Sequence, residues 1–144
     1  MKKLLFATIL LLTLTTAGFA AGNNTLFDNL RKAIKTTSNI VWKNSEEFKE
    51  AIFQFNGKTA VAQYNVDNDE LIGFSIYVGV DDLPAGTVQD VQKKFKGWAI
   101  ADKLLFIPAD GNAGGYYIEV TDGKSRFALS VRPNGKVKVY SRMP

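Results

Sequence analysis

Two acidic clusters contain the side chains of this chain that are best suited to metal binding or acid–base chemistry. Asp67, Asp69 and Glu70 lie in one predicted turn, and Asp81 and Asp82 come just before a predicted helix. Carboxylate oxygens bind Ca²⁺, but the twelve-residue spacing of a calcium loop is absent here. The needs of a turn and of a helix N-terminus account for all five residues, so neither cluster by itself predicts a metal site or a hydrolytic centre.

The residue types that most enzymes use for nucleophilic catalysis are missing. The chain has no histidine and no cysteine, which excludes Ser–His and Cys–His nucleophile systems, disulfides and zinc–thiolate sites. The glycine-rich stretch 111–115 lacks the Gly-Lys-Ser/Thr ending of a phosphate loop and precedes a strand. We therefore predict a protein that is not an enzyme, with no catalytic residues, no metal and no cofactor.

Hydrophobic periodicity predicts two helices and an antiparallel sheet. Leu26, Leu30 and Ile34 have helical spacing within 25–36, and a second helix is expected to open at 81–84 and to end at Gly97. Asn56-Gly57 is a strong hairpin signal, because both turn positions need a positive φ angle. The expected strands are 40–43, 48–55, 58–66, 70–79, 100–107, 116–121, 124–132 and 136–142.

The order of these elements repeats. A helix, a strand and three hairpin-linked strands occur at about 25–80 and again at about 81–142, and a shift of 66 residues places Asn56-Gly57 on Asp122-Gly123 and Ile52 on Ile118. We expect an α+β fold: a tandem duplication of a helix plus antiparallel strands, which forms one extended antiparallel sheet with two helices on one face. Residues 25–144 would be a single duplicated domain.

The first twenty residues are predicted to be a secretory signal peptide. Lys2 and Lys3 precede an apolar run, and small residues precede a cleavage point after Ala20. Residues 21–24 would be a short disordered start, and cleavage would leave no stable membrane anchor. The predicted localisation is periplasmic or secreted.

Charge is distributed unevenly along the predicted mature chain. Sixteen basic and fourteen acidic residues give it a net charge of +2; residues 21–82 hold six basic and nine acidic residues, and residues 83–144 hold ten basic and five acidic ones. So small a net charge, together with secretion, argues against a nucleic-acid partner.

The duplicated pattern resembles the secreted PepSY-like proteins of Bacteroidetes, whose fold is also compared with that of the β-lactamase inhibitor protein. The resemblance covers about 40–142. It is carried by Phe55-Asn56-Gly57-Lys58, Ala62-Gln63-Tyr64, Glu70-Leu71-Ile72-Gly73, Leu83-Pro84 with Val88, Lys93-Lys94-Phe95, Trp98 with Ile100, and Tyr116-Tyr117-Ile118-Glu119-Val120. These are turn and core positions, so the resemblance implies a fold and supplies no catalytic residues.

Strand alternation predicts an open sheet face rich in Tyr, Arg and Lys. If Tyr116, Ile118 and Val120 face the helices, Tyr117 and Glu119 point away from them, as Leu71 and Tyr77 do in the first half. The candidate binding residues are Tyr77, Tyr117, Arg126, Arg132, Lys138 and Tyr140. Aromatic and Arg side chains are enriched where proteins bind each other, so we expect a binding module for an unknown protein or peptide, such as an envelope enzyme that it would inhibit. The alternative is a small-ligand or cation binder that uses the acidic turn Asp67–Glu70.

Overall fold

The computed structural model describes residues 20–144, and their side chains from residue 25 onward. The signal peptide predicted for 1–20 lies outside this region except for its last residue. The elements in chain order are α2 (Ala20–Thr36), β1 (Val41–Asn44), β2 (Phe48–Phe55), β3 (Lys58–Asn65), β4 (Leu71–Tyr77), the 3-10 helix η2 (Val80–Asp82), α3 (Thr87–Lys94), β5 (Ala99–Pro108), β6 (Gly115–Thr121), β7 (Arg126–Val131) and β8 (Val137–Met143). Neither α-helix of the described part is long and apolar enough to cross a membrane.

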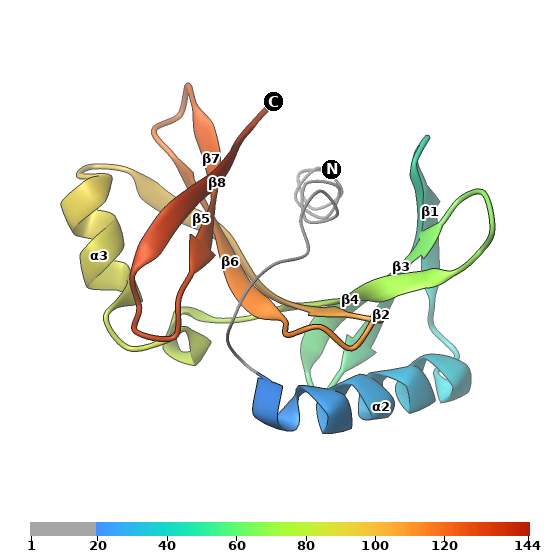
Figure 1. The fold of residues 1–144 in the computed structure, drawn as a ribbon. Helices are drawn as coiled ribbons and strands as arrows, with labels where there is room; N and C mark the ends of the chain where they lie inside the picture. The colour runs from blue at the N-terminus through green and yellow to red at the C-terminus, as the bar shows by residue number, and fades with distance from the viewer. Residues whose placement is uncertain (1–19) are drawn as a thin grey trace.

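The eight strands form one sheet in which each strand pairs with the next along the chain. All seven pairings are antiparallel, in the order β1 to β8. The fold class is therefore α+β, as predicted. Figure 1 shows that the sheet is strongly curved, with α2 on the outer side of the curve.

The Asn56-Gly57 hairpin has the backbone that its sequence predicts. Both residues have positive φ angles, 49° and 77°, and Phe55 pairs with Lys58 across the turn. Such a two-residue turn fixes the register of the two strands.

Helix α2 packs its apolar stripe on the first half of the sheet. Leu30 is fully buried among Ala51, Phe53, Phe74 and other strand residues. The helix begins at Ala20, earlier than the expected 25–36, and therefore includes residues 21–24. The Ala20-Ala21 pair favours helix, since alanine has the highest helix propensity.

The second α-helix starts later than the sequence suggested. Leu83 has an extended backbone, because a residue that precedes a proline is disfavoured in the helical region. Residues 80–82 form only a 3-10 turn, and α3 begins after Gly86, which has a φ angle of 89°. Val91 of α3 packs on Ile118, Leu129 and other apolar residues of the second half.

Three β-bulges interrupt the strand pairings; one lies in β5 between Ile100 and Lys103, and the other two change which side chains share a face in the last two strands of each half. The register shifts between Gln63 and Tyr64 on β3, and between Ala128 and Leu129 where β7 meets β8. The first bulge pairs Tyr64 with Leu71, so Leu71 packs on the α2 cluster and not on the opposite face as predicted. The second bulge pairs Arg142 with Phe127, and thereby moves Arg142 off the face that carries Lys138.

The strand registers divide the sheet into two faces, because directly paired residues point to the same side. The outer face carries one row that crosses seven strands: Phe53, Ala60, Ile76, Leu105, Tyr116, Val131 and Val137. Its first members belong to the cluster of α2 and its last members to the cluster of α3. We call the opposite face, which includes Glu50, Ser75 and Tyr77, the inner face.

The 66-residue shift does not preserve these faces. It aligns Ile52, which pairs with Val61 on the inner face, with Ile118, which belongs to the outer face. The cause lies in the turns, since Asn56-Gly57 is a two-residue turn, whereas Thr121 pairs with Arg126 across four residues. Strand β7 accordingly begins at Arg126 and not at residue 124.

Candidate binding face

Five of the six predicted binding residues lie on the inner face. Tyr77 pairs with Leu104, Leu104 with Tyr117, Tyr117 with Ser130, and Ser130 with Lys138, which makes one continuous row across five strands. Arg126 is on the same face of β7, and Tyr140 joins it through its contact with Tyr117. Arg132 is exposed beyond the end of β7, in the turn before β8.

Tyr117 is not an exposed contact residue. It is only 6% exposed and packs with Leu104, Ala128 and Met143 in a small apolar cluster on the inner face. The rings of Tyr117 and Tyr140 meet edge to face with centroids 5.3 Å apart. Strand alternation placed Tyr117 on the correct face. Its exposure was predicted wrongly, because the neighbouring side chains of that face cover it.

Arg126 is held by a buried ion pair. Its Nε donates to Glu119 Oε1 at 2.7 Å, and its Nη1 donates to the carbonyl of Pro144 at 3.1 Å. Glu119 is fully buried. The hydrogen bond to Glu119 raises the pKa of Arg126, and the charge of Asp102 contributes as well. Arg126 is therefore first of all the counter-ion of Glu119.

A second buried carboxylate, which was not among the predicted site residues, lies on the first half of the inner face. Glu50 on β2 is 3% exposed and accepts a hydrogen bond from Gln63 Nε2 on β3 at 3.2 Å. Burial raises the pKa of Glu50 to about 7, opposed by the hydrogen bond from Gln63 and by the charge of Lys43 on β1. The sequence feature that could have indicated this residue is a glutamate within the largely apolar strand FKEAIFQF.

Unpartnered polar atoms are concentrated on the inner face. Five buried side-chain atoms of the described residues have no hydrogen-bond partner: Gln63 Oε1, Ser75 Oγ, Glu119 Oε2, Arg126 Nη2 and Ser141 Oγ. The registers place all five residues on this one face. Buried polar groups are normally hydrogen-bonded, so a group of exceptions on one face needs an explanation.

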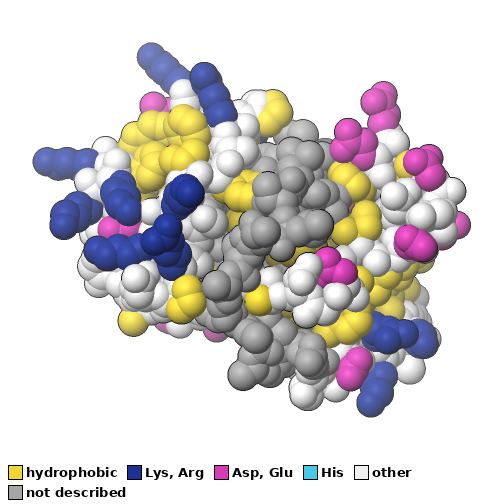
Figure 2. Space-filling model, viewed as in Figure 1, with side chains coloured by type: hydrophobic (Ala, Val, Ile, Leu, Met, Phe, Trp, Pro, Cys, Tyr) yellow, Lys and Arg dark blue, Asp and Glu magenta, His cyan; other side chains and the backbone are white. Residues whose placement is uncertain are grey.

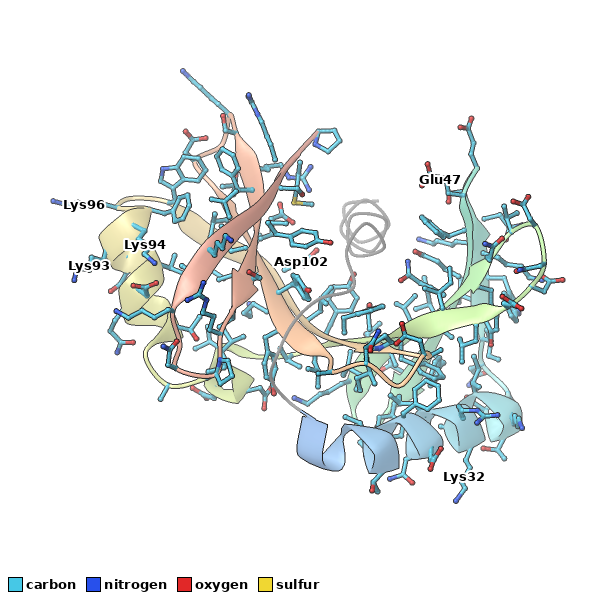
Figure 3. The ribbon with its side chains drawn as sticks, in the orientation of Figure 1. Lys32, Glu47, Lys93, Lys94, Lys96 and Asp102 are labelled. Carbon is cyan, nitrogen blue, oxygen red and sulfur yellow. The ribbon has the colours of Figure 1, made fainter. Side chains whose placement is uncertain are left out.

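Tyr77 lies in the field of three carboxylates. Burial raises the pKa of its phenol, and the charges of Asp102, Glu50 and Glu119 raise it further. Asp102 lies in a bulge of β5 opposite Glu119, between the pairs Ile100–Val120 and Lys103–Ile118. In Figure 3 Asp102 is on the inner side of the curved sheet, whereas Lys93 and Lys94 lie on α3, away from it.

The acidic turn Asp67–Glu70 is occupied by its own contacts. Asn65 Oδ1 accepts from the Asp67 amide, Asn68 Oδ1 accepts from the Glu70 amide, and Asp69 pairs with Lys49 at 3.0 Å. Among the described residues no group of three or more acidic side chains is arranged to hold a metal ion.

A small pocket lies on the other side of the sheet, beside α2. Its volume is about 230 Å³, and it is lined by Leu26, Phe55, Ile76, Leu105 and Tyr116 among others. Its charged residues, Lys58 and Asp82, form an ion pair with each other. None of the unpartnered buried atoms belongs to its lining, so the chemistry of this chain points to the inner face.

Surface charge is segregated between the two halves. Figure 2 shows most Lys and Arg side chains over α3, β7 and β8, with a smaller group over α2, and Asp and Glu gathered around β1 and the β3–β4 turn.

Solved structures share this fold at low sequence identity. A DUF2874 family protein from Bacteroides uniformis is 14% identical, with a TM-score of 0.60 over 83% of this chain and 86% of its own. A protein from Bacteroides eggerthii described as "putative periplasmic" is 17% identical, with a TM-score of 0.61 over 87% and 90%. A BLIP-like protein from Bacteroides fragilis is 14% identical, with a TM-score of 0.57 over 89% and 86%. No family model and no curated protein matches the sequence. At these identities the similarity shows a common fold.

Proposed function

We propose that this chain is a non-enzymatic binding protein, periplasmic or secreted, that binds a protein or peptide partner with the inner face of its sheet. The observation that carries the proposal is the mixed chemistry of that one face, which combines the polar side chains of Glu50, Gln63 and Glu119 with the exposed Lys138. A protein or peptide surface, with polar and apolar groups side by side, complements such a face better than an apolar ligand does.

Two further observations support a protein or peptide partner. Tyr77 and Tyr140 are half-buried on the same face, and tyrosine gives large contact area with a polar end. The neighbours described as BLIP-like and as periplasmic have the same fold, and the signal peptide predicted for residues 1–20 would direct this chain to export. An inhibitor of an envelope enzyme is the most specific form of the proposal.

The architecture behind this function is also a proposal. We infer a tandem duplication in which both helices cover the outer face, so that the inner face is left for a partner. The duplication is supported by the same element order in the two halves and by a β-bulge between the last two strands of each half. The placement of both helices is supported by the outer-face row from Phe53 to Val137, whose two ends belong to the clusters of α2 and of α3. Membership of the PepSY-like group belongs to the same proposal.

A comparative capture experiment tests the function. The exported protein is immobilised and exposed to periplasmic extract, as wild type, as Tyr77→Ala/Tyr117→Phe/Tyr140→Ala, and as Trp42→Ala. Trp42 is a matched control, because it is an exposed aromatic residue whose cross-strand partner, Ala51, is on the outer face. Phenylalanine at 117 preserves the apolar packing, and circular dichroism checks the fold of each variant.

The proposal predicts a partner retained by the wild type and by Trp42→Ala, and lost by the tyrosine variant. Equal retention by all three proteins, or no retained protein at all, would contradict it.

A further inference from the structure

We propose that two copies of this chain associate through the free edge of β1, side by side and antiparallel, so that Trp42 of one copy lies opposite Trp42 of the second copy. This edge is separate from the inner face, so the dimer is a property in addition to the proposed function. Three features of the molecule support it: the difference between the two edges of the sheet, the exposed side chains of β1, and the opposite charges at the two ends of that strand.

The two edges of the sheet differ in how they are protected. Strand β8 at one edge is covered at its start by α3, since Asp90 accepts from the Val137 amide at 2.8 Å and Lys94 donates to the Val137 carbonyl at 2.9 Å. The extra residue of its bulge, Tyr140, interrupts the edge further on. Among the described residues, β1 at the other edge pairs only with β2, and that pairing has no bulge. A regular edge strand that nothing covers is a template for another strand.

Strand β1 also exposes two large apolar side chains. Val41 is 57% exposed and Trp42 is 51% exposed, and the strand register places Val41 on the inner face and Trp42 on the outer face. Neighbouring side chains hold the Trp42 ring, whose centroid is 6.0 Å from that of Tyr64 and 5.4 Å from Lys49 Nζ. A strand added to β1 would remove part of this ordered apolar surface from water.

The edge carries opposite charges at its two ends. Glu46 and Glu47 follow β1 in the connection to β2, and Lys32 and Lys35 lie near the end of α2, which leads into the start of β1. All four side chains are exposed, and none forms an ion pair with another described residue. Figure 3 shows Glu47 and Lys32 at opposite ends of this edge. Antiparallel association places the acidic end of each copy beside the basic end of the other, and this self-complementarity favours a second copy over an unrelated strand.

The faces of β1 determine the register of the two copies. In an antiparallel pair directly opposite residues lie on the same side of the sheet, so the two-fold axis passes through one residue, which lies opposite itself. An axis at residue 41 or 44 would leave the two β1 strands almost without overlap, and an axis at Lys43 would set two like charges against each other. An axis at Trp42 sets Lys43 against Val41 and brings the two tryptophan rings together, which adds an aromatic contact.

The contact between the two copies is small, because β1 has only four residues. Interfaces of small area bind weakly, so we expect a Kd on the order of 100 µM. The second copy lies at the edge of the sheet and leaves the inner face open. Failure of the dimer would therefore leave the proposed function untouched, and the reverse also holds.

Sedimentation equilibrium measures the association. The full chain is expressed and exported, and the purified protein is studied from about 10 µM to about 1 mM, a range that brackets the expected Kd. Trp42→Ala should weaken the dimer at least about tenfold, since truncation of an interface tryptophan is among the costliest changes and each dimer loses two rings. Val139→Ala is the matched control, because Val139 is a similarly exposed apolar residue on the edge strand β8, and it should leave the Kd unchanged. Circular dichroism checks the fold of each variant.

Charge-reversal variants test the antiparallel arrangement. Glu46→Lys/Glu47→Lys makes both ends of the edge basic, and Lys32→Glu/Lys35→Glu makes both ends acidic. Each variant alone should dimerise more weakly than the wild type, because like charges then meet at both ends of the dimer. An equimolar mixture of the two variants should dimerise at least as well as the wild type, and added salt should weaken that mixed dimer.

Cysteine variants test the register, since the chain has no cysteine of its own. Val41 and Lys43 lie opposite each other in the dimer, and opposite residues of an antiparallel sheet have Cα atoms about 4.5–5.5 Å apart, within the range that a disulfide bridges. Under mild oxidation, an equimolar mixture of Val41→Cys and Lys43→Cys should form the mixed disulfide well above the half of all dimers that random pairing gives. Intact-mass spectrometry distinguishes the three products.

Several results would overturn the proposal. They are a wild-type protein that stays monomeric at about 1 mM, a dimer that Val139→Ala weakens as much as Trp42→Ala does, charge-reversed variants that dimerise no better together than apart, or a mixed disulfide at no more than its random share. A chain that stays monomeric and binds a strand of another protein at β1 would assign this edge to a foreign partner and would also refute the dimer.

Discussion

Glu50 and Gln63 are directly opposite each other on β2 and β3, and Gln63 Nε2 donates to Glu50 Oε1 at 3.2 Å on a face where both side chains are buried. A single hydrogen bond does not compensate for the burial of a carboxylate. The pKa of Glu50, about 7, records that imbalance.

The first prediction concerns stability and pH. The raised pKa of Glu50 means that the folded protein favours the neutral acid. The stability that protonated Glu50 contributes is therefore complete below the ordinary pKa of 4.5, and it is lost as pH rises through about 7. Glu50→Gln should therefore stabilise the protein at pH 8, by about 2 kcal/mol once solvent screening is allowed for, and have little effect at pH 4. Urea unfolding at the two pH values measures this. Equal effects at both would show that burial does not perturb Glu50; Glu47→Gln is the control.

The second prediction concerns the buried ion pair. Arg126→Ala removes the partner of Glu119 and leaves a buried carboxylate without a counter-ion, at a cost of about 3 kcal/mol in the free energy of unfolding. Arg132→Ala, which removes an exposed arginine from the adjacent turn, should change it by less than about 0.5 kcal/mol. Denaturant unfolding compares the two, and a similar effect of both substitutions would mean that the Glu119–Arg126 pair does not hold this face together.

The third prediction concerns the attachment of α3 to β8. Asp90 accepts from the Val137 amide at 2.8 Å and pairs with Lys94 at 2.9 Å, and these contacts lower its pKa. Their contribution to stability is present above the ordinary pKa of 3.8 and is lost as pH falls through the lower folded value. Asp90→Asn should lower the melting temperature at pH 7, and its difference from the wild type should shrink in strong acid. A difference that is constant between pH 7 and pH 2 would exclude a role of the charge; Asp81→Asn, an exposed replacement, is the control.

The fourth prediction concerns a close backbone approach. A Cβ atom at Gly135 would lie 2.1 Å from the carbonyl oxygen of Ala85, and Gly135 has a φ angle of 83°. Gly123 has a similar φ angle of 93° with nothing within 4 Å of such an atom. Both alanine variants carry the strain of a positive φ, about 1 kcal/mol, but Gly135→Ala must also displace the backbone of Ala85. Thermal unfolding should show a distinctly larger loss for Gly135→Ala than for Gly123→Ala, and equal losses would contradict the close approach.

Local patterns were sufficient to predict most of the strands, but not which face every side chain occupies. Asn56-Gly57 specified a turn whose backbone depends on the two residues themselves, so the hairpin was predictable. The bulges next to Tyr64 and between Ala128 and Leu129 depend on how two strands meet, and each reverses the alternation beyond it. That is why Leu71 was assigned to the wrong face, and why Arg142 does not share the face of Lys138.

The candidate site was predictable only in part for a similar reason. Alternation gave Tyr77, Tyr117 and Lys138 their common face, since they are near one another in a regular ladder. The burial of Glu50 and Glu119 depends on the pairing of β2 with β3 and of β6 with β7, which a single strand does not encode. Tyr117 was expected to be exposed, and its burial follows from the neighbouring side chains of the same face.

The most direct test of the central claim is site-specific photo-crosslinking on β8. Lys138 and Val139 are adjacent and exposed, but Lys138 pairs with Ser130 on the inner face and Val139 pairs with Leu129 on the outer face. A photo-reactive benzoylphenylalanine is placed at one position or the other in the full chain, which is expressed and exported before irradiation. We predict a discrete crosslinked partner from position 138 and none from position 139. The same products from both positions, or a product from position 139 alone, would contradict a binding function of the inner face.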